Sequence, residues 1–361
     1  MKNIYKIITL AGAFLAFLIG SGVATGQEVM QYYSPYGWKV IGTAVTIAVI
    51  LMIANYGYAY AGKNGSIEKG SDVFTFYCGP IAGKAFDLFT VLFCYMSYVV
   101  MVSGAASTLM QQYDLPLMAG ALLVVILAGI TVAFGLNSIV DIIGKIGPVL
   151  VLLIFIMSCV SLASNFGGIG DNIEAIESGA LSVTKAGDNW FLSGASNGGF
   201  CILWLAGFTA ALGMKEDFGT LMKANVVSSV VLVVVNTIIG LSILAQIDVV
   251  GTMQIPNLVL ASQIWPPLAN IFGILIFAAI YTSACPLLWT ASSRFSQEGT
   301  GRFKALTGIL AVIGLIIALY IPFNVLMNYI YVINGYLGFV VLAVMVVRMI
   351  IMRMKKKETA E

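Results

Sequence analysis

The sequence is dominated by long apolar segments, each near the length that an α-helix needs to cross a lipid bilayer. A membrane-spanning helix takes about 20 apolar residues, and ten segments of this 361-residue chain qualify. They lie at residues 5–33, 38–62, 84–111, 116–134, 139–164, 189–213, 221–246, 267–293, 304–321 and 323–350. Because 60% of the residues are hydrophobic and only 9% are charged, an ordinary soluble domain is excluded. We predict an all-α membrane protein in which residues 1–361 form one transmembrane domain.

The positive charges indicate how these segments cross the membrane. With the N-terminus in the cytoplasm, sixteen of the 18 lysine and arginine residues fall at cytoplasmic ends or loops, and only Lys39 and Lys185 fall outside. Such an excess of positive charge marks the inner side of a membrane, and one helix more or fewer would scramble it. Five segments that start inside and five that start outside predict two inverted repeats, at about residues 4–165 and 188–352. Between the seventh and eighth segments, the proline-bounded stretch 255–267 is too short to span and predicts an external helix.

The first apolar segment is interrupted by small and polar residues that lead into Gln27 and Glu28. Unpaired backbone groups are costly in hydrocarbon, so a non-helical backbone at this depth must line a cavity or be buried in protein. Unwound carbonyls can bind a cation, and free N–H groups can bind a carboxylate. A packing face of small residues is the alternative. Glu28 argues against it, because an ionisable residue at this depth is expected to contact water, a cation or a substrate. We therefore predict a substrate-binding break that is formed by Gly20, Ser21, Gly22, Val23, Ala24, Thr25 and Gly26.

The sixth apolar segment carries a second glycine-rich run, at residues 193–200. Paired interruptions in corresponding helices of two repeats indicate a binding site near the middle of the membrane. Polar atoms of a substrate would bind Ser196, Asn197 and the backbone of Gly198 and Gly199, with Phe200 and Trp204 as apolar cover. Helix packing through small residues remains the alternative, because no charged residue accompanies this run.

The string from Gly20 to Glu28 resembles the first helix of the YkvI-type bacterial membrane proteins, and the resemblance extends to about Arg353. These proteins are in turn similar to the amino acid, polyamine and organocation transporters that share the LeuT architecture. The resemblance implies a 5+5 inverted repeat in which helices 1 and 6 are broken. It also implies a multi-pass protein of the bacterial cytoplasmic (inner) membrane with both termini in the cytoplasm. It implies no particular substrate.

The same resemblance implies a coupling-cation site. LeuT-like sodium symporters use hydroxyls of the eighth helix together with carbonyls of the first helix, and the matching positions here are Thr282, Ser283, Ala16 and Ile19. Oxygen ligands of this kind suit a hard cation. The alternative is that the two hydroxyls hydrogen-bond to carbonyls of their own helix.

Three further residues are candidates for the site. The third helix faces the substrate in LeuT-like proteins, so Tyr98 or Ser103 is expected to line the cavity. Glu28 is expected to bind the coupling cation or proton, because the chain has no histidine that would shuttle one.

Composition and motifs exclude several other functions. The five cysteines show no CxxC spacing, and no P-loop motif is present, so a zinc site, a disulfide framework and ATP binding are not predicted. The positive residues lie at the ends of apolar segments and form no basic patch for nucleic acid. Without histidine or paired carboxylates at membrane depth, an enzyme is not expected either.

These observations predict a secondary transporter for a small polar solute, an amino acid or a related amine. Na⁺ or H⁺ would be the coupling ion, and no cofactor is expected. Helices 1, 2, 6 and 7 would move against helices 3, 4, 8 and 9. A ligand-sensing membrane receptor subunit with a transporter-like fold is the alternative. The solute, the direction of transport and the oligomeric state do not follow from the sequence.

Overall fold

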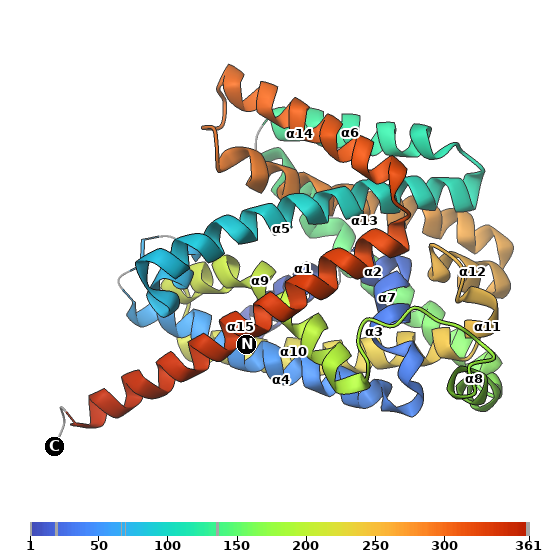
Figure 1. Ribbon diagram of the computed structural model, residues 1–361, viewed down its shortest axis with the longest axis horizontal. Coiled ribbons are helices and arrows are strands. Elements are labelled where there is room, and N and C mark those ends of the chain that lie inside the picture. The colour runs from blue at the N-terminus through green and yellow to red at the C-terminus, as the bar shows by residue number, and fades with distance from the viewer. Residues whose placement is uncertain (1, 19–20, 66, 69, 135–136, 359–361) are drawn as a thin grey trace.

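The computed structural model describes residues 2–18, 21–65, 67–68, 70–134 and 137–358, and in these ranges the regular structure is entirely helical (Figure 1). The α-helices are α1 (Lys2–Leu18), α2 (Ser21–Thr25), α3 (Gln27–Tyr32), α4 (Val40–Asn64), α5 (Val73–Tyr113), α6 (Leu117–Phe134), α7 (Asn137–Asn165), α8 (Gly168–Glu177), α9 (Trp190–Lys215), α10 (Phe218–Leu244), α11 (Ile247–Val250), α12 (Pro256–Ile264), α13 (Pro266–Ser293), α14 (Gly301–Tyr320) and α15 (Phe323–Glu358). Two 3₁₀ helices, η1 (Ser34–Lys39) and η2 (Gly70–Asp72), complete the set.

Eight helices of the described chain are long and apolar enough to cross a membrane. They correspond to α4, α5, α6, α9, α10, α13, α14 and α15. The stretch 151–165 of α7 forms a ninth candidate together with α8, but the two are bent by 88° at their junction. The first predicted segment contains a shorter apolar helix, Ile4–Leu15. A multi-pass, all-helical membrane protein is therefore confirmed, while the count of ten spans stays a prediction.

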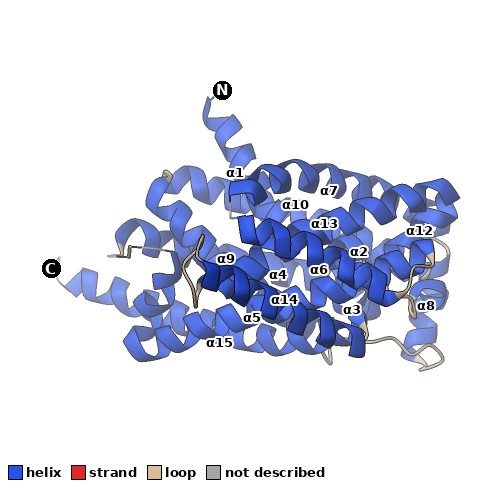
Figure 2. Cartoon of the chain, turned by 90° about the horizontal axis from the view of Figure 1, so that it is seen from above, coloured by secondary structure: helices blue, strands red, loops and turns tan. Residues whose placement is uncertain are grey.

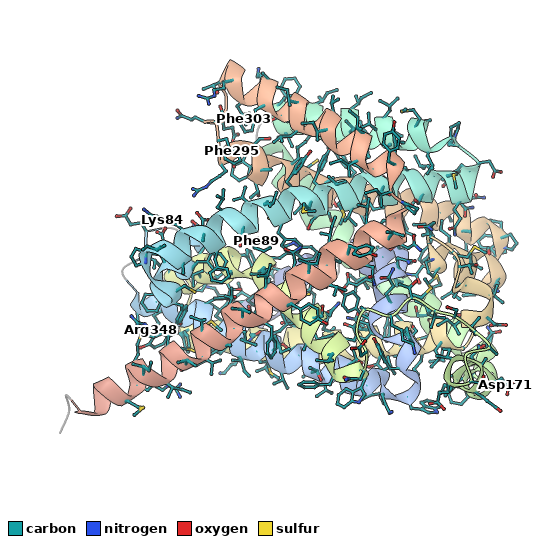
Figure 3. The ribbon with its side chains drawn as sticks, in the orientation of Figure 1. Lys84, Phe89, Asp171, Phe295, Phe303 and Arg348 are labelled. Carbon is teal, nitrogen blue, oxygen red and sulfur yellow. The ribbon has the colours of Figure 1, made fainter. Side chains whose placement is uncertain are left out.

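The surface of these helices is apolar where lipid would contact it. Large apolar side chains stand exposed in the middle of several long helices, among them Ile130, Val230, Ile274 and Ile309. Bilayer lipid is an apolar solvent, so such a surface is stable inside a membrane. Figure 2 shows the long helices lying roughly side by side, with the N-terminal end of α1 projecting from the bundle. In Figure 3, Lys84 and Arg348 lie at one end of the molecule and Asp171 at the other.

One group of helices is joined by buried polar contacts. Asn55 of α4 donates from Nδ2 to Oδ1 of Asn225 in α10 at 2.8 Å, and Thr209 of α9 donates from Oγ1 to Oδ1 of Asn55 at 3.0 Å. The hydroxyl of Tyr33, the residue that follows α3, accepts from Nδ2 of Asn236 in α10 at 2.8 Å. Buried polar groups of this kind need partners, so these contacts hold α3, α4, α9 and α10 together as one bundle.

A second group consists of α5, α6, α13 and α14, which pack against one another, and α6 and α14 lie side by side in the upper part of Figure 1. The hydroxyl of Tyr95 in α5 donates to the carbonyl of Leu310 in α14 at 3.0 Å. The hydroxyls of Thr131 in α6 and Tyr281 in α13 lie 2.6 Å apart. The two groups have the membership expected for helices 2, 6 and 7 and for helices 3, 4, 8 and 9, and α15 packs against both α9 and α5.

The structure does not contain the break predicted in the sixth segment, because α9 is one continuous α-helix from Trp190 to Lys215. Its small residues serve packing instead. A Cβ on Gly199 would clash with the carbonyl oxygen of Gly335 in α15, and a Cβ on Gly198 would lie 3.0 Å from the side chain of Ile50 in α4. The glycines therefore allow close helix contact, the alternative stated above, and helix 6 is not broken.

Candidate functional site

The first helix is interrupted in the structure. Helix α2 ends at Thr25, Gly26 adopts left-handed angles (φ 83°, ψ −10°), and α3 begins at Gln27. Glycine tolerates this conformation without strain. Ile19 and Gly20 lie outside the described residues, as do the side chains of Ala16 and Ser21. The interruption predicted for the first segment is thus present at Gly26, and Val23, Ala24 and Thr25 are all buried around it.

The carbonyls released at this interruption are held by a residue that sequence reasoning missed. Asn257 of the short helix α12 donates from Nδ2 to the carbonyl oxygens of Val23, at 3.1 Å, and Ala24, at 2.9 Å. Its side chain is fully buried, and Oδ1 lies 2.7 Å from where a Cβ on Gly26 would stand. A short external helix was expected at 255–267, but nothing in the sequence links it to a segment more than 230 positions earlier.

Glu28, in the first turn of α3, has a buried carboxylate with 5% of the residue exposed. Its Oε1 accepts a hydrogen bond from Nδ2 of Asn197 in α9 at 2.9 Å. The other oxygen, Oε2, lies against Gly22 at the position that a Cβ there would occupy. The structure therefore brings together Glu28, Asn197 and Gly22, three residues singled out from the sequence in two distant segments.

Aromatic rings continue from Asn197 along the same face of α9, since Phe200 and Trp204 follow it by three and seven positions. The Phe200 ring lies 5.2 Å from that of Trp204 and 4.7 Å from that of Tyr331 in α15, centroid to centroid. Tyr32, four residues after Glu28, packs its ring on Phe200 at 5.8 Å. Trp204 was expected to give apolar cover at the site, whereas Tyr331 was not predicted there.

The end of α3 and the start of α15 are joined by a network of amides that was also not predicted. Gln31 of α3 donates from Nε2 to the carbonyl of Asn324 at 3.1 Å and accepts from Nδ2 of Asn328 at 2.9 Å. Gln254, just before α12, donates to Oδ1 of Asn324 at 3.2 Å and accepts from its backbone N–H at 3.1 Å. These hydrogen bonds therefore join α3, α15 and the segment that precedes α12.

Other candidates lie away from the Glu28–Asn197 pair. Ser196 donates from Oγ to the carbonyl of Val332 at 3.5 Å, within the α9–α15 contact. The ring of Tyr98 packs where a Cβ on Gly314 of α14 would stand, 2.7 Å from Cε1. Ser103 donates to the carbonyl of Ile321 at 3.4 Å, at the end of α14. Tyr98 and Ser103 thus face α14 rather than the break.

The hydroxyls proposed for a cation site make contacts within their own helix. Thr282 and Ser283 both donate to the carbonyl of Ala279 in α13, at 2.8 and 3.0 Å. A hydroxyl that donates in this way keeps lone pairs that can bind a cation. The geometry is therefore compatible with a cation site as well as with hydrogen bonding within the helix alone. Helix α13 packs against α2, but Ile19 and the side chain of Ala16 lie outside the described residues.

Two apolar hollows in the protein lie away from the Glu28–Asn197 pair. One of about 440 Å³ is lined by residues of α1, α7 and α10 such as Leu15, Phe155 and Val231. The second, of about 350 Å³, lies between α5, α14 and α15. Both have almost no polar lining, which does not suit a polar solute.

No family model matches the sequence. Among known proteins, the chain is 28% identical over 141 residues to the uncharacterised Bacillus subtilis protein YyaD, which covers 38% of this chain and 39% of that protein. It is 22% identical over 157 residues to the uncharacterised membrane protein YkvI of the same organism, or 44% of each chain. The chain thus spans about two fifths of the length of the curated relatives it matches. The resemblance to YkvI is confirmed as a weak similarity.

Comparison with solved structures decides the architecture. MhsT in complex with L-phenylalanine superimposes with a TM-score of 0.64 at 16% identity, covering 93% of this chain and 88% of that one. The fold is the LeuT-like transporter fold. Inward-facing Mhp1 matches with a TM-score of 0.61 at 16% identity, covering 94% of this chain and 75% of its own. A Na⁺-coupled sialic acid symporter matches with a TM-score of 0.58 at 14% identity, covering 95% and 78%. By their titles, the sialic acid protein is a symporter and Mhp1 is a transporter of the nucleobase-cation-symport-1 family.

Proposed function

We propose that this protein is a secondary active transporter that carries a small polar solute by alternating access and is coupled to Na⁺ or H⁺. The observation that carries the proposal is the contact between Glu28 and Asn197 at the interrupted first helix. A buried carboxylate at an interrupted membrane helix is costly unless it serves a site. The proposal includes ten spans in two inverted repeats, with both termini in the cytoplasm.

Alternating access requires one set of helices to move as a unit against another. The polar contacts of Asn55, Thr209 and Asn225 support a rigid bundle of α4, α9 and α10, and the contacts between α5, α6, α13 and α14 support a scaffold. The amide network of Gln31, Gln254 and Asn324 would be the outer gate in its closed state. Opening would break these exchangeable hydrogen bonds and leave the apolar packing of each unit intact.

The coupling ion is proposed to be Na⁺ bound by Thr282, Ser283 and the carbonyls of Ala16 and Ile19. One structural neighbour is by its title a Na⁺-coupled symporter, which supports this choice over H⁺. The solutes named for the neighbours are phenylalanine and sialic acid, so a molecule of similar size is proposed here.

The test is uptake into proteoliposomes. Radiolabelled amino acids and amines are offered under an imposed Na⁺ gradient, an imposed H⁺ gradient or neither, with empty liposomes as the control. We expect accumulation of at least one solute under one of the two gradients and equilibration without it. Specific binding of a solute that is never taken up would instead indicate a ligand-sensing receptor.

A further inference from the structure

The end of α4, the start of α10 and the last turns of α15 meet in a cluster of aromatic rings and positive charges. The ring of Tyr56 in α4 lies 6.5 Å from that of Tyr60 and 5.4 Å from that of Phe218 in α10, centroid to centroid. Arg353 of α15 donates from Nη2 to the hydroxyl of Tyr56 at 2.9 Å, and its Cζ lies 5.7 Å from the centroid of that ring. Nζ of Lys63 lies 5.6 Å from the centroid of Phe218. Three helices thus place two cations on one aromatic surface.

The positive charge of this surface exceeds its negative charge. Neither Lys63 nor Arg353 belongs to an ion pair of the described residues, and both side chains are exposed. The neighbouring carboxylate of Glu216 is already in an ion pair. Asp217 interacts electrostatically with both Lys63 and Lys223, so one carboxylate is shared by two lysines. A negatively charged partner is therefore attracted to this end of the molecule.

The same surface has an apolar side, which α15 supplies. With 36 residues, α15 is about 54 Å long, whereas the hydrocarbon core of a bilayer is about 30 Å thick. In Figure 1 the C-terminal turns of α15 project beyond the rest of the molecule. Ile350, Ile351 and Met354 flank Arg353 on these turns and are exposed. Exposed apolar and basic side chains on one helix end suit the boundary between acyl chains and lipid headgroups.

The polar groups of the cluster suit a phosphate. A guanidinium has five N–H donors, so Arg353 keeps donors for an oxygen anion after its bond to Tyr56. Arginine binds phosphate through its planar fork, and lysine binds it as a point charge. Tyrosine rings, as at Tyr56 and Tyr60, are enriched at the level of the lipid headgroups. Soluble phosphate would use the two cations alone, whereas a phospholipid would also cover the exposed apolar residues of α15.

On these grounds we propose that this surface binds an anionic phospholipid. The phosphate pairs with Lys63 and Arg353, and an acyl chain lies along the exposed apolar residues at the end of α15. A lipid bound in this way joins α15 to α4 and α10 and stabilises the protein. The proposal goes beyond transport, because it holds whichever solute the protein carries.

Thermal unfolding of the full chain in nanodiscs tests the proposal. The discs contain phosphatidylcholine with increasing fractions of phosphatidylglycerol, which is anionic. We expect the unfolding temperature of the natural protein to rise by several degrees with the phosphatidylglycerol fraction. Most of the rise should disappear in about 1 M salt, where the screening length is about 3 Å. Inorganic phosphate or glycerol 3-phosphate, added to discs of phosphatidylcholine alone, should give no such rise.

The variant that removes the site is Lys63→Gln combined with Arg353→Gln, which should lose at least half of the rise. Its matched control is Arg302→Gln combined with Lys304→Gln. This control removes the same two charges from exposed positions of α14 and should keep the rise. Arg353→Lys keeps the charge and tests the site if the first variant does not fold, because it should retain most of the rise.

Four results would overturn the proposal. The first is an unfolding temperature of the natural protein that does not depend on phosphatidylglycerol. The second is an equal rise in the variant that lacks Lys63 and Arg353, or the loss of the rise in Arg353→Lys. The third is an equal loss in the α14 control, which would indicate a general effect of surface charge. The fourth is a rise with inorganic phosphate that equals the rise with phosphatidylglycerol, which would indicate a site for a soluble anion.

Discussion

The amide group of Asn257 has two N–H groups, and it turns toward two successive carbonyls at the end of α2. Carbonyls at the end of a helix have no partner within that helix, and inside a membrane no bulk water is present to replace one. A single side chain therefore stabilises the interruption of the first helix. It does so from α12, which is not a membrane-spanning segment.

Replacing Asn257 with Ala should destabilise the protein, because the carbonyl of Ala24 would lose its donor and that of Val23 would keep only the backbone N–H of Gly26. Leaving buried polar groups unsatisfied costs about 1–3 kcal/mol. Thermal unfolding in detergent or nanodiscs measures the change. Ser262→Ala, on the same helix, is the matched control, because the hydroxyl of Ser262 donates to the carbonyl of Val259 in its own helix, at 2.8 Å. Equal stability of the two variants would show that the cap is dispensable.

Replacing both Thr282 and Ser283 with Ala should raise the Na⁺ concentration needed for half-maximal uptake. Both hydroxyls are bonded to the carbonyl of Ala279, and α13 does not depend on those bonds, so folding is expected to survive. Thr290→Ala removes a similar bond to the carbonyl of Pro286 in the same helix and serves as the control. An unaltered Na⁺ requirement in the double variant would reject the cation site.

At the scale of the helices, the two glycine-rich runs have opposite outcomes. The first includes a real interruption at Gly26, and the second is an uninterrupted helix packed on α15. Both runs are rich in glycine and other small residues, because such residues favour close helix packing as well as unwinding of a helix. What separates them in the sequence is Glu28, an ionisable residue directly after the first run, whereas no charge follows the second.

Gly199→Ala should therefore destabilise the protein, because the added methyl group would meet the backbone of Gly335, which cannot rotate away. Overpacking of this kind costs about 1–3 kcal/mol. Gly308→Ala in α14 has the opposite expectation, since nothing lies within 4 Å of its Cβ position and Ala is favoured over Gly in a helix by about 1 kcal/mol. Unfolding temperatures of the two variants compare these effects, and a stabilised Gly199→Ala variant would refute the packing role.

The sequence predicted the architecture better than it predicted the site. Apolar length and the flanking prolines indicated the long helices and the short helix α12, because these features depend on local composition. The sequence also singled out Glu28 and Asn197. It did not reveal that Asn257 caps α2 or that Gln31 meets Asn324, since hydrogen bonds between distant segments leave no periodic pattern. Tyr98 and Ser103 were expected at the cavity and face α14 instead.

At the scale of the whole molecule, the proposed function predicts that cross-linking the gate formed by Gln31, Gln254 and Asn324 stops transport. Gln254 and Asn324 are joined by two hydrogen bonds, so cysteines at both positions are expected to be cross-linked by a short bifunctional thiol reagent. Uptake should then fall to background, and a reducible cross-linker should allow its recovery. The controls are the two variants with only one of these cysteines added, treated with the same thiol reagent. They show the effect of modifying the five native cysteines. Full uptake by the cross-linked protein would exclude an outer gate at this place.

Helix α12 reaches the middle of the first helix through one amide while its own outer residues, Gln263 to Trp265, stay exposed. Thermodynamic linkage is reciprocal. An antibody fragment that gripped this outer surface in one position would thus change how tightly the protein holds its solute, and the solute would change the grip of the antibody by the same factor. Under the proposed function, such a fragment would inhibit transport from the face of the protein on which α12 lies.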